Sequence, residues 1–276
     1  MLLAELPRLL ATDLDGTLLR RDGSISARTQ QALQRARAAG IELLMVTGRP
    51  ARHVAKIEGT AELGGSVICV NGALIYDLDR EQIVSEERLS AAVARELVQS
   101  LRSRLPGISF AVEVGLDFGW EPSYALHRKR TEPPRLPIVD ALRLCERGVN
   151  KLIARHPQLS AEELLGQSRD LFVERAQVSY SGAPFLEISA AEVSKASALA
   201  AYCAERRIHR DRVLSFGDMP NDLPMLQWAG HSVAMSNAHP SVLAAVHEVT
   251  LSNEEDGVAI VVERLLSGEC RPAHAQ

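Results

Sequence analysis

Two carboxylates stand close together near the start of the chain. Asp13 and Asp15 are two residues apart in the segment Ala-Thr-Asp-Leu-Asp-Gly-Thr (11–17), after the apolar run 8–10. If that run is a strand, both side chains point to the same side. Two adjacent negative charges destabilise a fold unless a cation binds between them. Magnesium is the natural candidate, because it favours a few hard oxygen ligands and keeps part of its water shell. An acidic turn is the alternative, since Asp and Gly are frequent turn residues.

A hydroxyl and a glycine follow the next apolar segment. Residues 41–46 are nearly all apolar and predict a buried strand, which ends at Thr47-Gly48-Arg49-Pro50. Pro50 suits the first turn of a helix. Thr47 and Gly48 would therefore lie where a strand meets a helix N-terminus, and free N–H groups and a hydroxyl bind anions at such a place. The alternative is that Thr47 only caps the helix.

Two further polar residues, Asn71 and Lys195, stand at the ends of predicted elements. Asn71 follows a third buried strand, predicted over residues 66–70. It either faces a ligand or is a turn residue with a left-handed backbone. Lys195 lies in the first turn of a helix that residues 194–197 open. A lysine there opposes the helix dipole, and such local conflicts often mark functional sites. An ordinary surface lysine is the alternative.

A second acidic group follows the strand predicted over residues 212–216. The next residues, Gly217-Asp218-Met219-Pro220-Asn221-Asp222, place two carboxylates and an amide at another strand-to-helix junction. An acidic helix cap explains Asp218 by itself, but it does not explain Asn221 and Asp222 beside it.

Strand, helix and strand alternate through both ends of the chain, which predicts right-handed parallel crossovers. We therefore expect an α/β fold with a doubly wound, Rossmann-like parallel sheet. Between residues 84 and 186 the pattern changes to alternating strands mixed with helices, including a strand candidate at 171–180, which predicts an inserted α+β module. The expected domains are 1–83 with 187–276, and 84–186.

The carboxyl edge of an open parallel sheet is where ligands bind. Asp13 with Asp15, Thr47, Lys195 and Asp218 each lie at a predicted strand exit or helix start. We expect them to converge there. Carboxylates with magnesium, a hydroxyl and a lysine are the groups that phosphoryl transfer requires.

Composition limits the partners. Charged residues make up 24% of the chain with a net charge of -4, and aromatic residues make up 4%. Neither a nucleic-acid surface nor a membrane surface is indicated, and no apolar run reaches the ~20 residues of a membrane span. The basic run 127–130 either attracts an anionic substrate or is a solvated loop.

The four cysteines include no C-x-x-C pair, and Cys69 and Cys203 lie in apolar patterns typical of core thiols. The N-terminal residues do not have the pattern of a signal peptide. We therefore expect a reducing, cytoplasmic setting.

Taken together, the motifs resemble the haloacid dehalogenase-like hydrolase superfamily, and within it the Cof-type phosphatases. The resemblance rests, in order, on segments 13–17, 46–49 and 71–73, on Lys195, and on segment 217–222. The inserted module resembles the family's α/β cap, which determines substrate specificity. The family often has glycine directly after the motif lysine, where this chain has Ala196.

The resemblance implies a magnesium-dependent phosphatase acting on small phosphomonoesters, such as sugar phosphates. Asp13 would attack phosphorus and become an aspartyl phosphate, and Asp15 would serve as general acid and then as base. Magnesium would be held by an Asp13 oxygen, the Asp15 backbone carbonyl and Asp218, with Asp222 supporting the ion through water or a neighbouring ligand.

The same resemblance implies a phosphate site. Thr47, the Gly48 N–H, Lys195 and Asn221 would hold phosphate oxygens, and Arg49 would steady the site or reach the substrate. Two alternatives stay open. One is a phosphosugar mutase of the same superfamily, which shares every core motif. The other is a non-catalytic phosphoacceptor or phosphate-sensing domain, which would need neither Asp15 nor a cap. The identity of the substrate and the oligomeric state are not encoded in these motifs.

Overall fold

The computed structural model describes residues 5–125, 134–180 and 183–268. The chain divides into two compact units. The core unit comprises the residues up to Val84 and those from Ser194 onward, and the inserted unit comprises Ser85–Val193. Each unit has its own sheet, so each has its own core.

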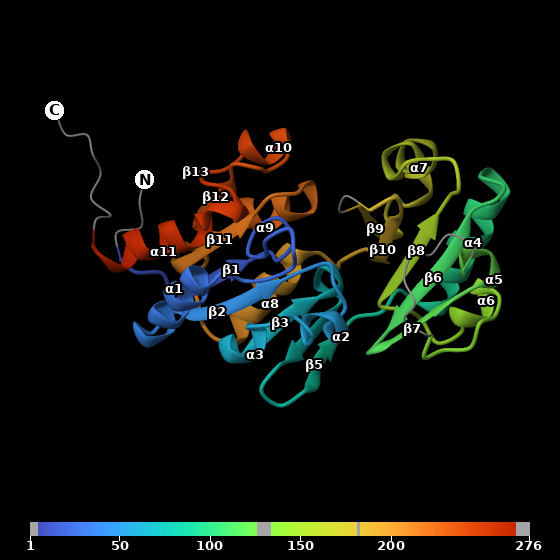
Figure 1. The fold of residues 1–276 in the computed structure, drawn as a ribbon. Coiled ribbons are helices and arrows are strands. Elements are labelled where there is room, and N and C mark those ends of the chain that lie inside the picture. Colours follow the sequence, from blue (N-terminus) through green and yellow to red (C-terminus); the bar gives the residue numbers. More distant parts are fainter. Residues whose placement is uncertain (1–4, 126–133, 181–182, 269–276) are drawn as a thin grey trace. The chain divides into compact units, whose positions relative to one another are not determined.

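The core unit is built on one eight-stranded sheet (Figure 1). In sheet order its strands are β13 (Glu248–Thr250), β12 (His231–Met235), β11 (Val213–Gly217), β1 (Leu9–Thr12), β2 (Glu42–Val46), β3 (Ser66–Cys69), β4 (Leu74–Asp77) and β5 (Gln82–Glu86). The strands from β13 to β3 run parallel, and β4 runs antiparallel to β3. Strand β1 is buried throughout, which suits its central place between β11 and β2.

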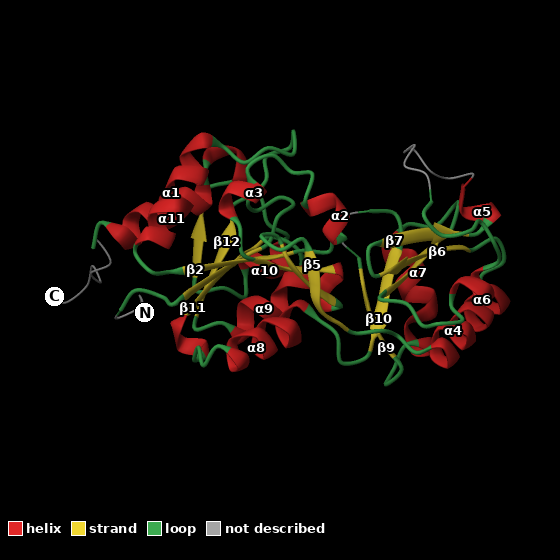
Figure 2. Cartoon of the chain, turned by 90° about the horizontal axis from the view of Figure 1, so that it is seen from below, coloured by secondary structure: helices red, strands yellow, loops and turns green. Residues whose placement is uncertain are grey.

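Helices cover both faces of this sheet. Figure 2 shows α1 (Ala27–Ala38) and α11 (Gly257–Leu266) on one face and α8 (Lys195–Glu205) and α9 (Leu223–Trp228) on the other. The remaining helices of the unit are single turns: α2 (Ala51–Val54), α3 (Thr60–Leu63) and α10 (Pro240–Leu243). The predicted doubly wound, Rossmann-like α/β core is therefore confirmed.

Local sequence signals define the ends of α1. The Ser26 side chain accepts a hydrogen bond from the Thr29 N–H and caps the first turn. Gly40 follows the last turn with a φ of 84°, a left-handed conformation that favours glycine. The helix predicted to begin at Pro50 is the single turn α2, which has Pro50 as its N-cap and ends at Val54.

The inserted unit is a five-stranded antiparallel sheet with its two longer helices on one face. In sheet order its strands are β7 (Asp117–Trp120), β6 (Ser109–Val114), β8 (Lys151–Arg155), β10 (Leu186–Ala190) and β9 (Ala176–Ser179). Its helices are α4 (Ala91–Arg104), α5 (Pro122–Ala125), α6 (Ala141–Leu144) and α7 (Ala161–Ser168). Leu97 of α4 and Leu164 of α7 share one apolar core with Phe110 and Leu152 of the sheet. The predicted α+β composition is confirmed.

Two details of this unit differ from the sequence-based expectation. Strand β10 pairs with β8 and β9, so the chain stays in the inserted unit until Val193 and not only to residue 186. The strand expected at 171–180 starts only at Ala176, because Phe172 packs into the core from a turn and Glu174 has a φ of 58°.

Three further expectations concern the basic run, the cysteines and membrane-spanning segments. The basic run 127–130 and Cys270 lie outside the described residues. The predicted core thiols Cys69 and Cys203 are buried and free of disulfide bonds, as is Cys145. Among the residues described, every helix is too short or too polar to cross a lipid bilayer.

Candidate active site

The site is built where the parallel strands of the core unit end. Strands β11, β1, β2 and β3 are neighbours in the sheet, and the predicted site residues follow their C-terminal ends or begin α8. Parallel strands end at the same edge, so this order brings together segments that are far apart in the sequence.

Asp13 and Lys195 form the centre of the site. The Lys195 ammonium donates to Asp13 Oδ1 at 2.5 Å and to Asp222 Oδ1 at 2.6 Å. All three residues are buried, and Lys195 and Asp222 are at most 2% exposed. Burial alone would lower the lysine pKa, but the two carboxylates outweigh it and raise the pKa above its usual range. Lys195 is therefore a structural cation and not a surface lysine.

Asp222 organises the loop after β11. Its Oδ2 accepts the backbone N–H groups of Asp218 at 3.1 Å and Met219 at 2.9 Å, while Oδ1 accepts Lys195. Gly217 is needed here, because a Cβ at this position would lie 2.6 Å from the Asp222 Cβ. Since hydrogen bonds occupy both carboxylate oxygens, Asp222 holds Lys195 and the Asp218 backbone in place.

Asp218 is fixed by Thr17, the last residue of the first acidic segment. The Thr17 hydroxyl donates to Asp218 Oδ1 at 2.8 Å and is itself 1% exposed. Gly16 has a φ of 79°, and a Cβ there would lie 2.9 Å from the Asp218 Cγ. The carboxylate of Asp218 therefore packs against the bare backbone of Gly16.

A divalent cation fits the three carboxylates. Oxygen atoms of Asp13, Asp218 and Asp222 all lie within 4.8 Å of one another. Burial raises the pKa of Asp13 well above its usual value, although the Lys195 charge lowers it. Burial and the Asp222 charge raise the pKa of Asp218 to about 6, although the hydrogen bond from Thr17 lowers it. Three carboxylates face one ammonium, so a divalent ion would balance the group. Asp13 and Asp218 offer the free oxygens, because both Asp222 oxygens are engaged.

Thr47 and Gly48 lie at the exit of β2, as expected. Thr47 is 1% exposed, and its hydroxyl accepts the Arg49 N–H at 3.1 Å. The capping alternative is wrong, because the N-cap of α2 is Pro50 and no side chain caps this helix. The Thr47 hydroxyl instead holds the turn before α2, and its proton stays available to an anion. A Cβ at Gly48 would lie 2.9 Å from the Asn71 Oδ1, so this turn requires glycine.

Asp15 and Arg49 form an ion pair at the outer side of the site. Arg49 Nε donates to Asp15 Oδ2 at 2.7 Å, and its Nη2 donates to the other carboxylate oxygen. The Asp15 side chain is 56% exposed and stands apart from the metal-competent group of Asp13, Asp218 and Asp222. The hydrogen bond to Asp15 outweighs burial and raises the pKa of Arg49 above its usual range. Arg49 therefore positions Asp15, a contact that the motifs do not predict.

Asn71 has the left-handed backbone that the turn alternative predicts. Val70, Asn71 and Gly72 have φ values of 55°, 56° and 109°, so three successive residues after β3 are left-handed. For a buried β-branched residue such as Val70 this conformation is a genuine outlier. The bend aims the Asn71 Oδ1 at Asn221, whose Nδ2 donates to it at 3.3 Å. The other side-chain atom of Asn221, Oδ1, is buried without a partner.

Gly72 lets this bend reach the helix that carries Lys195. A Cβ on Gly72 would lie 2.7 Å from the backbone carbon of Ser194, which caps α8. Thr17, Gly72 and Asn237, whose Nδ2 donates to the Gly16 carbonyl at 2.8 Å, are the supporting residues that sequence reasoning missed. Thr17 and Gly72 belong to the quoted motifs, but nothing in the sequence links Asn237 to the site.

Known proteins that resemble this chain belong to one family of hydrolases. The sequence model of the haloacid dehalogenase-like hydrolases matches residues 10–262. YxeH of Bacillus subtilis is 31% identical over 94% of this chain and 98% of its own. The pyridoxal phosphate phosphatase YbhA of Escherichia coli is 27% identical over 91% and 96%.

A solved structure of the same family has a similar fold. A haloacid dehalogenase-like hydrolase from Bacteroides thetaiotaomicron is 28% identical and superposes with a TM-score of 0.74, over 94% of this chain and 99% of its own. The chain therefore belongs to the haloacid dehalogenase-like hydrolase family.

Proposed function

We propose that the protein is a magnesium-dependent phosphatase that hydrolyses small phosphomonoesters through an aspartyl-phosphate intermediate. One observation carries the proposal: a buried Asp13 carboxylate is held by Lys195 beside Asp218 at the carboxyl edge of the sheet. A buried nucleophile next to fixed cationic groups is what phosphoryl transfer requires. The relatives named above include a phosphatase, and the enzyme is a phosphoric monoester hydrolase.

The reaction divides into two displacements. An Asp13 oxygen attacks phosphorus, the ester P–O bond breaks, and Asp15 gives its proton to the leaving alkoxide. Water then attacks the aspartyl phosphate, Asp15 takes the water proton, and inorganic phosphate leaves with the Asp13 carboxylate restored. Arg49 holds Asp15 on the exposed side of the site, where the alcohol part of the substrate would lie.

The remaining residues bind the phosphoryl oxygens. Lys195 supplies the buried positive charge, Thr47 a hydroxyl, and Gly48 a backbone N–H in the turn between β2 and α2. The unpartnered Asn221 Oδ1 lies beside the Asn71 contact, so Asn221 is a further candidate for substrate contact. Asp13 and Asp218 would hold magnesium with support from Asp222, and the ion, when bound, neutralises charge on the phosphoryl group.

The inserted unit is proposed to act as the cap that selects the substrate, and the cytoplasm is the proposed setting. The cap follows from the family resemblance, and the cytoplasmic setting follows from the described cysteines, which are buried and form no disulfide. A small phosphorylated metabolite is the proposed substrate, and neither nucleic acid nor membrane is a proposed partner. Family membership in a class of hydrolases favours turnover over a purely sensing role.

The test is phosphate release from a panel of phosphorylated metabolites by the purified protein. We expect magnesium-dependent release that Asp13→Asn removes and that Asp211→Asn, an exposed change on the core unit, leaves intact. Release by Asp13→Asn close to the wild-type rate would contradict the proposal. Conversion of a sugar phosphate into its isomer, without net release, would assign the mutase activity instead.

A further inference from the structure

A polar pocket lies at the end of the core sheet where strands β2 and β3 begin. It has a volume of about 430 Å³ and is lined by the first residues of β2 and β3, the turn after α3 and the C-terminal end of α8. Strands β2 and β3 end at the candidate active site and begin at this pocket, so the two places are at different ends of the same strands. None of the candidate active-site residues lines the pocket.

One wall of the pocket is a fixed group of three side chains. The Tyr202 hydroxyl donates to Glu42 Oε1 at 2.5 Å, and Arg206 Nε contacts the same oxygen at 3.1 Å. The Arg206 guanidinium also stacks on the Tyr202 ring, with its carbon 3.6 Å from the ring centroid. Burial and the Glu42 hydrogen bond raise the pKa of Tyr202 to about 12, so the phenol keeps its proton. The Arg206 charge is therefore balanced by Glu42 and by its neighbour Glu205, whose carboxylate lies 3.3 Å from Arg206 Nη1.

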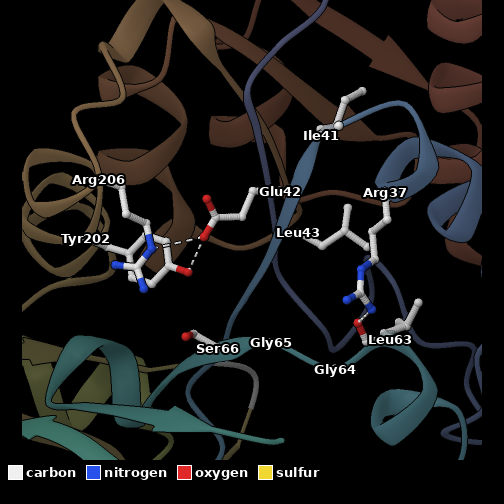
Figure 3. A pocket seen from close by; sticks show the side chains of 11 residues that line it. Arg37, Ile41, Glu42, Leu43, Leu63, Gly64, Gly65, Ser66, Tyr202 and Arg206 are labelled. Atoms are coloured by element: carbon white, nitrogen blue, oxygen red, sulfur yellow. Dashed lines mark hydrogen bonds and ion pairs between the residues drawn. The ribbon is translucent and has the colours of Figure 1, made fainter.

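The facing wall carries a guanidinium without a counter-charge. Arg37, in the last turn of α1, donates through Nη1 to the backbone carbonyl of Leu63. No described carboxylate lies within ion-pair distance of it. Figure 3 shows Arg37 and Leu63 on one side of the pocket and Glu42 with its two partners on the other. Arg206 is paired with Glu42 and also contacts the Glu205 carboxylate at 3.3 Å, so among the described lining residues Arg37 is the guanidinium that has no carboxylate partner.

We propose that this pocket binds a small anionic metabolite through a carboxylate or phosphate group that contacts Arg37. A planar guanidinium with several N–H donors matches both anions in a bidentate geometry. The volume lies in the lower part of the range for small-molecule sites. Ser66 and the stacked Arg206 also line the pocket and offer further polar contacts to the rest of the ligand. Binding here does not depend on the proposed phosphatase activity.

The test uses malonate and selenate as carboxylate and phosphate-like probes, titrated calorimetrically without metal. The variant is Arg37→Gln, and the matched control is Arg35→Gln, which changes another basic residue in the same last turn of α1. Both side chains are exposed, so both variants are expected to fold. We expect Arg37→Gln to weaken binding of at least one probe about tenfold or more, as loss of a charged hydrogen bond does, and Arg35→Gln to leave it unchanged.

A third variant, Thr47→Val, removes a hydroxyl assigned to the phosphate site and so tests for binding at the active site; the anomalous signal of selenate in crystals locates the probe directly. The proposal expects probe binding to survive Thr47→Val and a selenate peak beside Arg37. Equal affinities for Arg37→Gln and Arg35→Gln, or selenate found at the active site alone, would overturn it. Preference for one probe distinguishes a carboxylate ligand from a phosphate ligand.

Discussion

A pair of glycine substitutions separates backbone strain from damage to the site. Gly16 and Gly23 are both left-handed, with φ values of 79° and 84°. A Cβ at Gly23 would meet nothing within 4 Å, whereas a Cβ at Gly16 would lie 2.9 Å from the Asp218 Cγ. An alanine at either position has the same left-handed conformation to adopt, at a cost of about 1–2 kcal/mol. Only Gly16→Ala also pushes against a residue of the site.

The size of the displacement follows from contact distances. Carbon atoms pack at about 3.5–4.0 Å, so Asp218 must move by about 1 Å to accept the new methyl group. A misplacement of about 1 Å can reduce the rate of a catalysed reaction about a hundredfold. We therefore expect Gly23→Ala to keep the wild-type kcat and Gly16→Ala to lose about two orders of magnitude. Both lose stability through backbone strain, and Gly16→Ala loses more because of its contact with Asp218.

Phosphate release at saturating magnesium and urea unfolding of the same preparations measure the two quantities. The unfolding experiment shows that any loss of activity in Gly16→Ala does not come from a smaller folded fraction. If Gly16→Ala turned over as fast as Gly23→Ala per folded molecule, the packing of Asp218 on Gly16 would have no part in the reaction. The assignment of Asp218 to the metal site would then lose its structural support.

Three further predictions concern metal, charge and pH. Magnesium at about 100 times its dissociation constant should stabilise the wild type against unfolding by about 2.7 kcal/mol, and Asp218→Asn should reduce this gain in a thermal shift assay. In the inserted unit Lys151 and Glu187 form a buried ion pair, so Lys151→Met should cost about 3–5 kcal/mol in urea unfolding, and a cost under 1 kcal/mol would contradict it. Hydrogen bonds from His231 and then Arg264 hold the pKa of Glu248 below its ordinary 4.5 despite burial. The ionised Glu248 therefore stabilises the fold at pH values above 4.5, its pKa in the unfolded chain, and this stabilisation is lost as the pH falls through its lower pKa in the folded protein. Glu248→Gln should make the urea midpoint depend less on pH in the acid range.

Much of the site follows from the sequence because each predicted residue stands at a strand exit. Apolar runs identify β1, β2, β3 and β11, and the parallel order brings their C-terminal ends to one edge. Asp13, Thr47 and Asp218 can therefore be grouped before any coordinates are known. Lys195 is detected differently, since a lysine in the first turn of α8 conflicts with the helix dipole unless carboxylates face it.

Contacts between segments that are distant in sequence could not be predicted. The pairing of Arg49 with Asp15, the hydrogen bond from Thr17 to Asp218, and the approach of Gly72 to Ser194 depend on packing and not on local pattern. Short helices and strands could not be predicted from the sequence either. Strand β7 and helix α6 have four residues each, too few for a periodic pattern to distinguish them from loops.

The most direct test of the account is to find where the phosphoryl group is bound during turnover. Asp15→Asn should let Asp13 react but slow the second displacement, because the base for water is lost. After acid quenching with a good phosphoester substrate, mass spectrometry of the digested protein should show one added phosphoryl group on the peptide that contains Asp13. An unmodified Asp13 peptide during active turnover, or a phosphoryl group on another residue, would contradict the central claim.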